Sequence, residues 1–492
     1  MGASIDNRSG SAPSWFASGK SRVRAGLHIG VSVLSALWLS VGVAQAADDR
    51  NLTPRRTLFL TLDAVPFSLL AELTSAARGD DRMFGDFQPP VPLISTFPST
   101  TTIALGEAFE SAGLRRAPGY EARFFDRRLG KVRGGGVLSY FRIDFPWRRF
   151  FDWSSKGAVR SALAGARPVR VSGKRVVRSV EEFLAGEERE FFAYVDTTDL
   201  ASHLRSPAAL EPALRRLDRA LTEARLRHPT SDFRVVVLSD HGIAGGEPLD
   251  NVWPEIKRRL GEAGYRYAKR LRRPTDIAFV PFGLVSSLEA YTEEEQTPRV
   301  AELLASVGGV EACVYRLDKS SVRDQGWRIA GAQGVADVYR RQRAFGSEWA
   351  YRMLSADPLG YAEVVEGLRN PTGEKGEEWF SDRSWFEASN RHRLPDAPYR
   401  IARAFELVDN PASVICSLEP GYMFGSRATE RTARFTKGRL EWTHGALHWE
   451  ASAGFLMSDD PEWKPEGPVR IGRALEPFLD TKSARNVAKT SE

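Results

Sequence analysis

The sequence predicts an α/β fold, a three-layer sandwich with a central, mostly parallel sheet and an inserted cap subdomain. Three apolar runs predict strands that are buried on both faces, as the strands of parallel sheets are. An amphipathic helix is expected over 210–227, between the last two strands, and strand, helix, strand in that order forms the crossover unit of a parallel sheet. The three predicted strands are residues 56–62, 190–195 and 235–238.

Length and composition are those of an ordinary globular protein. The chain has 492 residues, of which 42% are hydrophobic and 27% charged, so it is long enough to bury a large core. Its 69 basic and 63 acidic residues leave a formal charge of +6. This excess is too mild to predict a nucleic-acid-binding surface.

Residues 1–46 have the three-part form of a secretory signal peptide. A basic lead precedes an apolar run over 25–43, and an Ala-Gln-Ala cleavage site ends at Ala46. The competing interpretation is an uncleaved membrane anchor, which His28 inside the run disfavours. We therefore expect an exported protein, secreted or periplasmic, that is cleaved near Ala46 and has no membrane span afterwards.

Residues with metal-binding side chains follow the predicted strands. Asp63 comes directly after the first strand and Asp240-His241 after the third, while Asp199 and His203 follow the second at a spacing of four. The carboxyl ends of parallel strands meet at one edge of a sheet, so we expect these side chains to lie together. Asp and His are ligands that zinc accepts. For each aspartate taken alone, capping of the next helix is the alternative interpretation.

Two further segments carry polar residues of the same kind. Thr100, Thr101 and Thr102 lie at the N-terminus of a helix that is expected to run through 103–112, and a helix N-terminus is suited to holding an anion. Near the end of the chain, His444 is followed by Gly, as His241 is, shortly before a last predicted strand.

The domain prediction divides the chain into a core and an insertion. A signal peptide over 1–46 precedes a catalytic core made of 47–271 and 433–492, and residues 272–432 form a cap or lid of short elements. An aromatic and basic cluster at 140–153 is interpreted as a surface packing feature. The chain has two cysteines, Cys313 and Cys416, and the sequence leaves open whether they form a disulfide.

Five separated pieces of the chain occur in an order that resembles the alkaline-phosphatase superfamily, and most of all its nucleotide pyrophosphatase/phosphodiesterase branch. The pieces are an Asp after the first strand, a Thr after Pro-Ser-x, Asp-x-x-x-His, Asp-His-Gly and a late His-Gly. The resemblance covers about residues 56–245 and 433–460. It departs at Ala64, where the family usually has Gly, and near Glu107, where a Thr-Gly pair is absent.

The resemblance implies a site for two divalent metal ions, expected to be zinc, although manganese or iron can use the same ligands. It makes Thr101 the nucleophile between the ions, with Thr100 as the alternative because three adjacent threonines leave the register open. His448 is the alternative to His444. The implied ligand sets are Asp199, His203 and His444 for one ion, and Asp63, Asp240 and His241 for the other. The Thr101 hydroxyl is implied as a further ligand that approaches the second of these ions.

The implied function is an exported hydrolase of small phosphoric esters, of the phosphodiester or nucleotide pyrophosphate type. Two metal ions and a hydroxyl nucleophile are a common device for phosphoryl transfer. Phosphomonoesters and phosphonates are alternative substrates for the same site. An alternative of another class is an envelope binding protein that keeps the metal cradle without turnover, and loss of activity on chelation would separate the two. The oligomeric state is not predicted.

Overall fold

The computed structural model describes residues 55–111, 114–121, 123–134, 146–154, 167–229, 233–280, 285–317, 324–344, 346–369, 379–425 and 440–479. The predicted signal peptide therefore lies outside the described residues. No helix within these ranges combines the length and the apolar character that a bilayer span requires.

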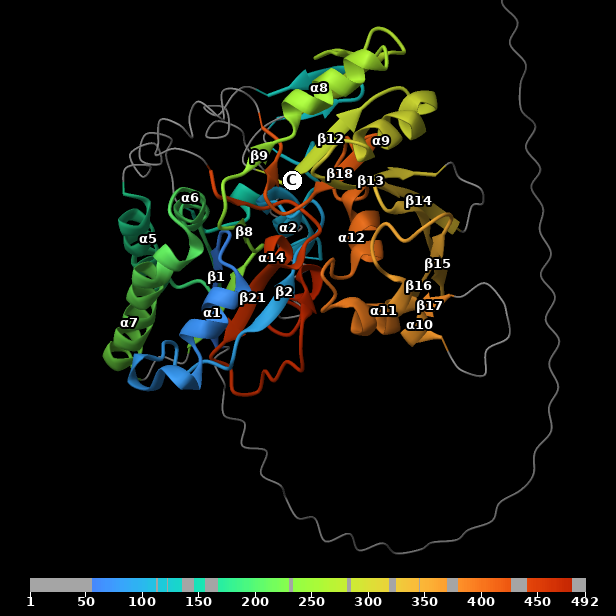
Figure 1. Cartoon of the computed structure of the whole chain (residues 1–492). Helices are drawn as coiled ribbons and strands as arrows, with labels where there is room; N and C mark the ends of the chain where they lie inside the picture. Colours follow the sequence, from blue (N-terminus) through green and yellow to red (C-terminus); the bar gives the residue numbers. More distant parts are fainter. Residues whose placement is uncertain are drawn as a thin grey trace, which may run out of the picture. The chain divides into compact units, whose positions relative to one another are not determined.

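Seven strands form the first sheet, in the order β22-β2-β21-β7-β1-β6-β5 (Figure 1). Strand β21 runs antiparallel to both of its neighbours, and the other pairings are parallel. The sheet is thus mostly parallel, as predicted, and the three predicted strands are β1, β6 and part of β7. The strands are β1 (Arg56–Leu62), β2 (Val91–Ile94), β5 (Trp153–Ser154), β6 (Glu190–Val195), β7 (Phe233–Ser239), β21 (Ala453–Ser458) and β22 (Val469–Arg470).

The side chains of the central strands alternate between two hydrophobic cores, one on each face of the sheet. In β1, Leu58 and Leu60 belong to one core and Phe59 to the other, as the two-residue period of a strand requires. Figure 1 shows two of the covering helices, α5 and α7, side by side. Helices therefore cover both faces, which confirms the three-layer prediction. The helices are α1 (Phe67–Leu73), α5 (Pro168–Ala185) and α7 (Glu211–Arg227) on one face and α2 (Thr101–Ala108) on the other.

Two local predictions need correction. The helix expected over 103–112 begins at Thr101 and ends at Ala108. The described part of the aromatic cluster is not a surface feature, because Trp147 and Phe151 are buried in the core beneath α2. The sequence suggested a surface position because basic residues alternate with these rings.

Nine strands between residues 266 and 418 form a second sheet, in the order β10-β11-β12-β18-β13-β14-β15-β16-β17. They overlap the predicted cap over 272–432, whose boundaries remain a prediction. Instead of only short elements, this part contains β14, β15 and β16 of 8, 10 and 8 residues. The strands are β10 (Arg266–Tyr267), β11 (Asp276–Phe279), β12 (Ser287–Tyr291), β13 (Val310–Arg316), β14 (Asp324–Gly331), β15 (Gly334–Arg343), β16 (Gly346–Met353), β17 (Phe380–Ser381) and β18 (Val414–Leu418).

Helices pack on both faces of the second sheet as well. One core also contains Phe97 and Ile103, which flank the start of α2, so the second sheet packs against the segment that carries the three threonines. The helices are α8 (Trp253–Glu262) and α9 (Thr297–Ala305) on one face, and α10 (Ala362–Leu368), α11 (Asp382–Ser389) and α12 (Ala397–Ala404) on the other.

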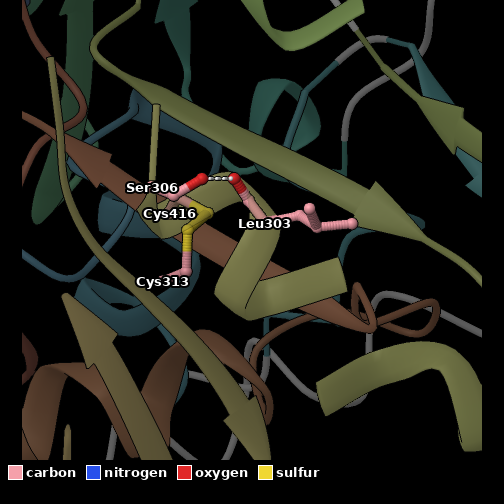
Figure 2. Close-up of a disulfide and its surroundings, with 4 residues drawn as sticks. All are labelled: Leu303, Ser306, Cys313 and Cys416. Carbon is pink, nitrogen blue, oxygen red and sulfur yellow. Dashed lines mark hydrogen bonds between the residues drawn. A yellow bond between two sulfur atoms is a disulfide. The ribbon is translucent and has the colours of Figure 1, made fainter. Parts of the chain in front are cut away.

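A disulfide joins Cys313 and Cys416 across neighbouring strands of this sheet (Figure 2). The two residues are directly opposite each other in the antiparallel register of β13 and β18. Both are fully buried in the core under α9, whose last turn is closed by a hydrogen bond from Ser306 Oγ to the Leu303 carbonyl in the same view. The question that the sequence left open is thereby answered in favour of the bond.

Candidate metal centre

Three parallel strands end at the same edge of the first sheet and bring their following residues together. Leu62 at the end of β1 is level with Val195 of β6 and with Ser239 of β7. Asp63 and Asp240 therefore emerge side by side, at the position where open α/β sheets collect their functional residues. Neither aspartate caps a helix: α1 begins after Pro66, and a short strand follows His241.

The first group of ligands consists of Asp63, Asp240 and His241, whose ligand atoms lie within 4.8 Å of one another. His241 Nε2 is 3.4 Å from Asp63 Oδ1 and 3.7 Å from Asp240 Oδ2. Each of the three residues is at most 3% exposed. Two carboxylates and one imidazole thus face a common point inside the protein.

The second group consists of Asp199, His203 and His444, within the same 4.8 Å limit. Asp199 and His203 share one face of helix α6 (Thr197–Leu204), and His203 Nε2 is 3.0 Å from Asp199 Oδ1. His444 Nε2 is 3.6 Å from the same oxygen. His444 arrives here because β20 (Trp442–Thr443) pairs with β8 (Ala244–Gly245), just after His241.

The two groups adjoin each other. The rings of His241 and His444 stack with centroids 4.1 Å apart, and the rings of His203 and His444 are 5.1 Å apart. The structure therefore gathers the six predicted Asp and His ligands into one place. Their role as ligands remains a proposal, taken up below.

All three histidines of the site have the same tautomer fixed by a backbone carbonyl. Nδ1 lies 2.8 Å from Trp442 O in His203, 2.9 Å from Gly242 O in His241 and 2.8 Å from Ser99 O in His444. A carbonyl oxygen can only accept, so Nδ1–H donates in each ring, and Nε2 is the nitrogen that faces the carboxylates and is placed to bind a metal. Metal-binding histidines are oriented in this way by their outer nitrogen.

The ligand set suits a divalent cation. His241 Nε2 and Asp240 Oδ2 are buried and have no hydrogen-bond partner among the described residues. Buried polar atoms are normally paired, so two adjacent ones without a partner indicate a group that binds between them. Nitrogen and oxygen donors of this kind are those of zinc and related metals.

The electrostatics of the apo chain point in the same direction. Burial raises the pKa of Asp63 well above its usual range, and the charges of Asp240 and Asp199 raise it further. Burial also raises the pKa of Asp240. Burial and the neighbouring His241 lower the pKa of His444. Buried carboxylates that repel one another are stabilised by a bound cation.

Of the three threonines, Thr101 lies against the first group. Its Oγ1 donates a hydrogen bond of 3.1 Å to Asp63 Oδ1, whereas Thr100 Oγ1 donates to the Tyr120 carbonyl at 3.3 Å. Thr101 is the first residue of α2 and Thr100 is its N-cap position. The geometry therefore favours Thr101 over Thr100 as the hydroxyl of the site.

His448, the alternative to His444, lies elsewhere. Its Nε2 is 3.0 Å from the Leu418 carbonyl and 3.2 Å from Glu311 Oε2, in the second sheet. His392 and His228 are also outside the site. His228 is exposed, and His392 is half-buried against Tyr361.

Sequence reasoning missed a residue that holds Asp63. Tyr194 Oη donates a short hydrogen bond to Asp63 Oδ2, the oxygen that Thr101 does not use. Tyr194 is 2% exposed and packs on Trp147, with ring centroids 4.9 Å apart. The available signal was a tyrosine in an otherwise apolar buried strand, since a buried phenol usually finds a polar partner.

Ala64 explains why the resembled family has glycine after the first aspartate. Its φ angle is +54°, in the left-handed region that residues other than glycine rarely adopt. Its N–H lies 3.3 Å from Asp240 Oδ1, so this turn ties the first group together. The chain thus keeps the glycine conformation with an alanine side chain, at a cost in strain.

No protein-family model and no curated protein matches the chain. Among solved structures, it is similar to murine ectonucleotide pyrophosphatase/phosphodiesterase 5, with 10% identity and a TM-score of 0.43 over 86% of this chain and 94% of that one. It is also similar to phosphonoacetate hydrolase from Sinorhizobium meliloti 1021 in complex with phosphonoformate, with 13% identity and a TM-score of 0.43 over 88% and 96% of the two chains. Likeness at this level carries no inference about activity, which has to come from the site.

Proposed function

We propose that the chain is a metal-dependent hydrolase of phosphoric esters, of the phosphodiester or nucleotide pyrophosphate type. In this proposal Thr101 is the nucleophile and two divalent ions, zinc in the first instance, are held by the two ligand groups. The observation that carries it is the contact between the Thr101 hydroxyl and Asp63, beside two adjoining groups of Asp and His whose Nε2 atoms face the carboxylates.

The chain's own residues set up the reaction. When bound, two metal ions would favour the ionised hydroxyl and offset the charge on the phosphoryl oxygens. Thr101 Oγ1, whose proton passes to solvent, would attack phosphorus and form a threonine–phosphoryl bond, while the bond to one ester oxygen breaks and that oxygen leaves with the bonding electrons and takes up a proton from solvent. Attack of water on the phosphorus of this intermediate, which still carries the second organic group of the diester, would then release the phosphomonoester and restore the Thr101 hydroxyl, as one proton of the water goes to the threonine oxygen. The N-terminus of α2, where Thr101 lies, favours an anion at that point.

The test combines metal content with turnover on the mature protein. Elemental mass spectrometry of the wild type should find about two zinc ions per chain. The same samples should hydrolyse bis-p-nitrophenyl phosphate, and a comparison with p-nitrophenyl phosphate and a phosphonate ranks the substrate classes. Chelation should abolish turnover, and added zinc should restore it.

Two threonine variants separate the nucleophile from its neighbours. Thr101→Ala should keep both metal ions and lose turnover, because only the hydroxyl is removed. Thr100→Ala is the matched control, since its hydroxyl contacts the Tyr120 carbonyl instead of Asp63. Metal without turnover of any ester would favour the binding-protein alternative. A wild type that binds no metal, even when zinc is supplied, would contradict the proposal.

We also propose that the protein is exported. The signal-like pattern over 1–46 supports this, and so does a disulfide made by the two cysteines of the chain, because such bonds persist in oxidising compartments. N-terminal sequencing of protein recovered from the periplasm or medium should start just after Ala46. A first residue within 1–20 would contradict cleavage.

A further inference from the structure

Arg400 of α12 is a buried cation whose recorded hydrogen bonds include no carboxylate. It is 1% exposed, and the nearby Asp396 gives both of its oxygens to Arg470. The Arg400 guanidinium donates instead to carbonyl and hydroxyl oxygens, and its Nε has no partner among the described residues. Its acceptors are the carbonyls of Pro395, Ala446 and Leu447 and the hydroxyls of Ser99 and Ser452.

Four of these five acceptors lie on the two segments that deliver Thr101 and His444, and the fifth, the Pro395 carbonyl, lies just before α12. Arg400 Nη2 donates to Ser99 Oγ at 3.0 Å, two residues before Thr101. Its Nη1 donates to the Leu447 carbonyl at 2.7 Å, three residues after His444. The guanidinium therefore connects the two segments through hydrogen bonds.

Ser99 is the point where the two segments meet. Its carbonyl accepts the Nδ1–H of His444 at 2.8 Å, and its N–H donates to the Gly445 carbonyl at 3.2 Å. Its Oγ also lies 3.1 Å from the Ala446 carbonyl. A shift of Ser99 would thus move Thr101 and turn the His444 ring at the same time.

A packing role alone does not explain a buried arginine. Removing a charge from water is costly unless hydrogen bonds compensate, and an apolar side chain of similar volume would fill the space without that cost. Burial lowers the pKa of Arg400 to about 10, so the side chain is still a cation at neutral pH. An apolar residue has no donors. The planar guanidinium of Arg400 has five, and with them it holds the start of α12, the segment before Thr101 and the segment after His444 at fixed distances.

We propose that Arg400 is a positioning residue, which sets the distance between the Thr101 hydroxyl and the ligand group that contains His444. This inference rests on the proposed function. Arg400 does not contact the ligand atoms, and it acts through Ser99 and the carbonyls that follow His444. It thereby links the second sheet, which carries α12, to the site at the edge of the first.

The test compares Arg400→Met with Arg470→Met. Arg470 is a matched control because it is also a buried arginine of this region, 5% exposed, but it binds Asp396 and Asp382 instead of either segment. Arg400→Met should bind its second zinc ion 10- to 100-fold more weakly, as loss of outer-shell residues typically does. Its kcat should fall by a similar factor with little change in KM, and Arg470→Met should keep both values.

Two milder variants keep the inference testable where Arg400→Met folds poorly. Ser99→Ala removes one hydrogen-bond acceptor of Arg400, and Arg400→Lys keeps the positive charge without the planar guanidinium group. Both should show intermediate losses of zinc affinity. Hydrogen exchange gives a readout that does not need metal. Amides of residues 96–102 and 440–448 should exchange faster in the Arg400 and Ser99 variants than in the wild type, and their exchange rates should be unchanged in Arg470→Met.

The outcomes distinguish the positioning role of Arg400, called the clamp here, from the proposed hydrolase activity. If Arg400→Met and Arg470→Met lose zinc affinity and exchange protection alike, Arg400 is only structural and the inference is wrong. If the wild type binds zinc without hydrolysing esters, the catalytic proposal fails, while zinc affinity and exchange still decide the clamp. A wild type that binds no metal contradicts both, because the clamp would then position no site.

Discussion

The two ligand groups lie in the same place but are positioned by different structural elements. Asp63, Asp240 and His241 follow two neighbouring parallel strands and are almost completely buried. Asp199 and His203 come from a short helix, and His444 from a segment some 200 residues after His241, with the Asp199 side chain 27% exposed. The first group is therefore fixed by the sheet itself, whereas the second depends on how a distant segment docks. We expect the second metal position to be the weaker one.

The largest expected effect comes from breaking the first group. Asp240→Asn should lower turnover on the order of 10³-fold, because it removes a ligand charge from a site built around Thr101. It should also leave about one zinc ion per chain. Asp199→Asn should remove the other ion. Asp250→Asn, an exposed aspartate, is the control. Equal loss of both ions in each variant would show that the two positions are not independent.

Removal of the disulfide should weaken the second group more than the first. Ser417, next to Cys416, accepts the N–H of Leu447, and Ser286, directly before β12 of the second sheet, donates to the His444 carbonyl. Cys313→Ala/Cys416→Ala should lower the free energy of unfolding by about 2–5 kcal/mol, as loss of a native disulfide does. Urea titration measures that loss, and competition with a chelating dye should show one zinc ion released more easily. If stability fell by the full amount while zinc affinity stayed unchanged, the second sheet would not influence metal binding at the site.

Tyr194→Phe should affect the first group alone. The change removes the hydroxyl that orients Asp63 and keeps the ring against Trp147. Loss of such a partner typically weakens metal binding about 10- to 100-fold. Zinc competition on Tyr194→Phe and on Asp199→Asn/Tyr194→Phe would locate the effect. Asp199→Asn is expected to release the ion of the second group. If Tyr194→Phe weakened binding of that same ion, the assignment of Asp63 to the first group would be wrong.

The smallest expected effect is a gain in the free energy of unfolding. Ala64→Gly should relieve the left-handed strain at the turn beside Asp63 and raise stability by up to about 1 kcal/mol. The greater freedom of glycine in the unfolded chain offsets part of this gain. Thermal unfolding of both proteins, with and without zinc, measures it. A loss of more than about 1 kcal/mol would show that the methyl group contributes packing that outweighs the strain.

Local sequence was sufficient for the first group and for two of the three residues of the second. The strand ends placed Asp63, Asp240 and His241, and the spacing of four placed Asp199 and His203 on one helix face. The His-Gly pattern singled out His444, but its assignment to a ligand group came only through the resemblance, because nothing near it in the sequence indicates a contact with the segment after β7. The register of the threonines and the role of Tyr194 likewise depend on contacts between different strands.

The second sheet was harder to predict because its longest strands do not look apolar. Strand β15 reads GVADVYRRQR, with Ala336 and Val338 buried and its last residues charged and exposed. Such a strand is stabilised by its neighbours on both sides rather than by an apolar run of its own. The first sheet, buried on both faces, leaves a much plainer pattern.

The late arrival of His444 also has a consequence for biosynthesis. Strand β21 lies between β2 and β7, so the first sheet stays open until residues 453–458 have been made. A growing chain that has reached only residue 440 contains Thr101 and five of the six proposed ligands, but neither His444 nor the strand that closes the sheet. The finished site is therefore a product of the completed chain, and a nascent or prematurely terminated polypeptide would have an incomplete one.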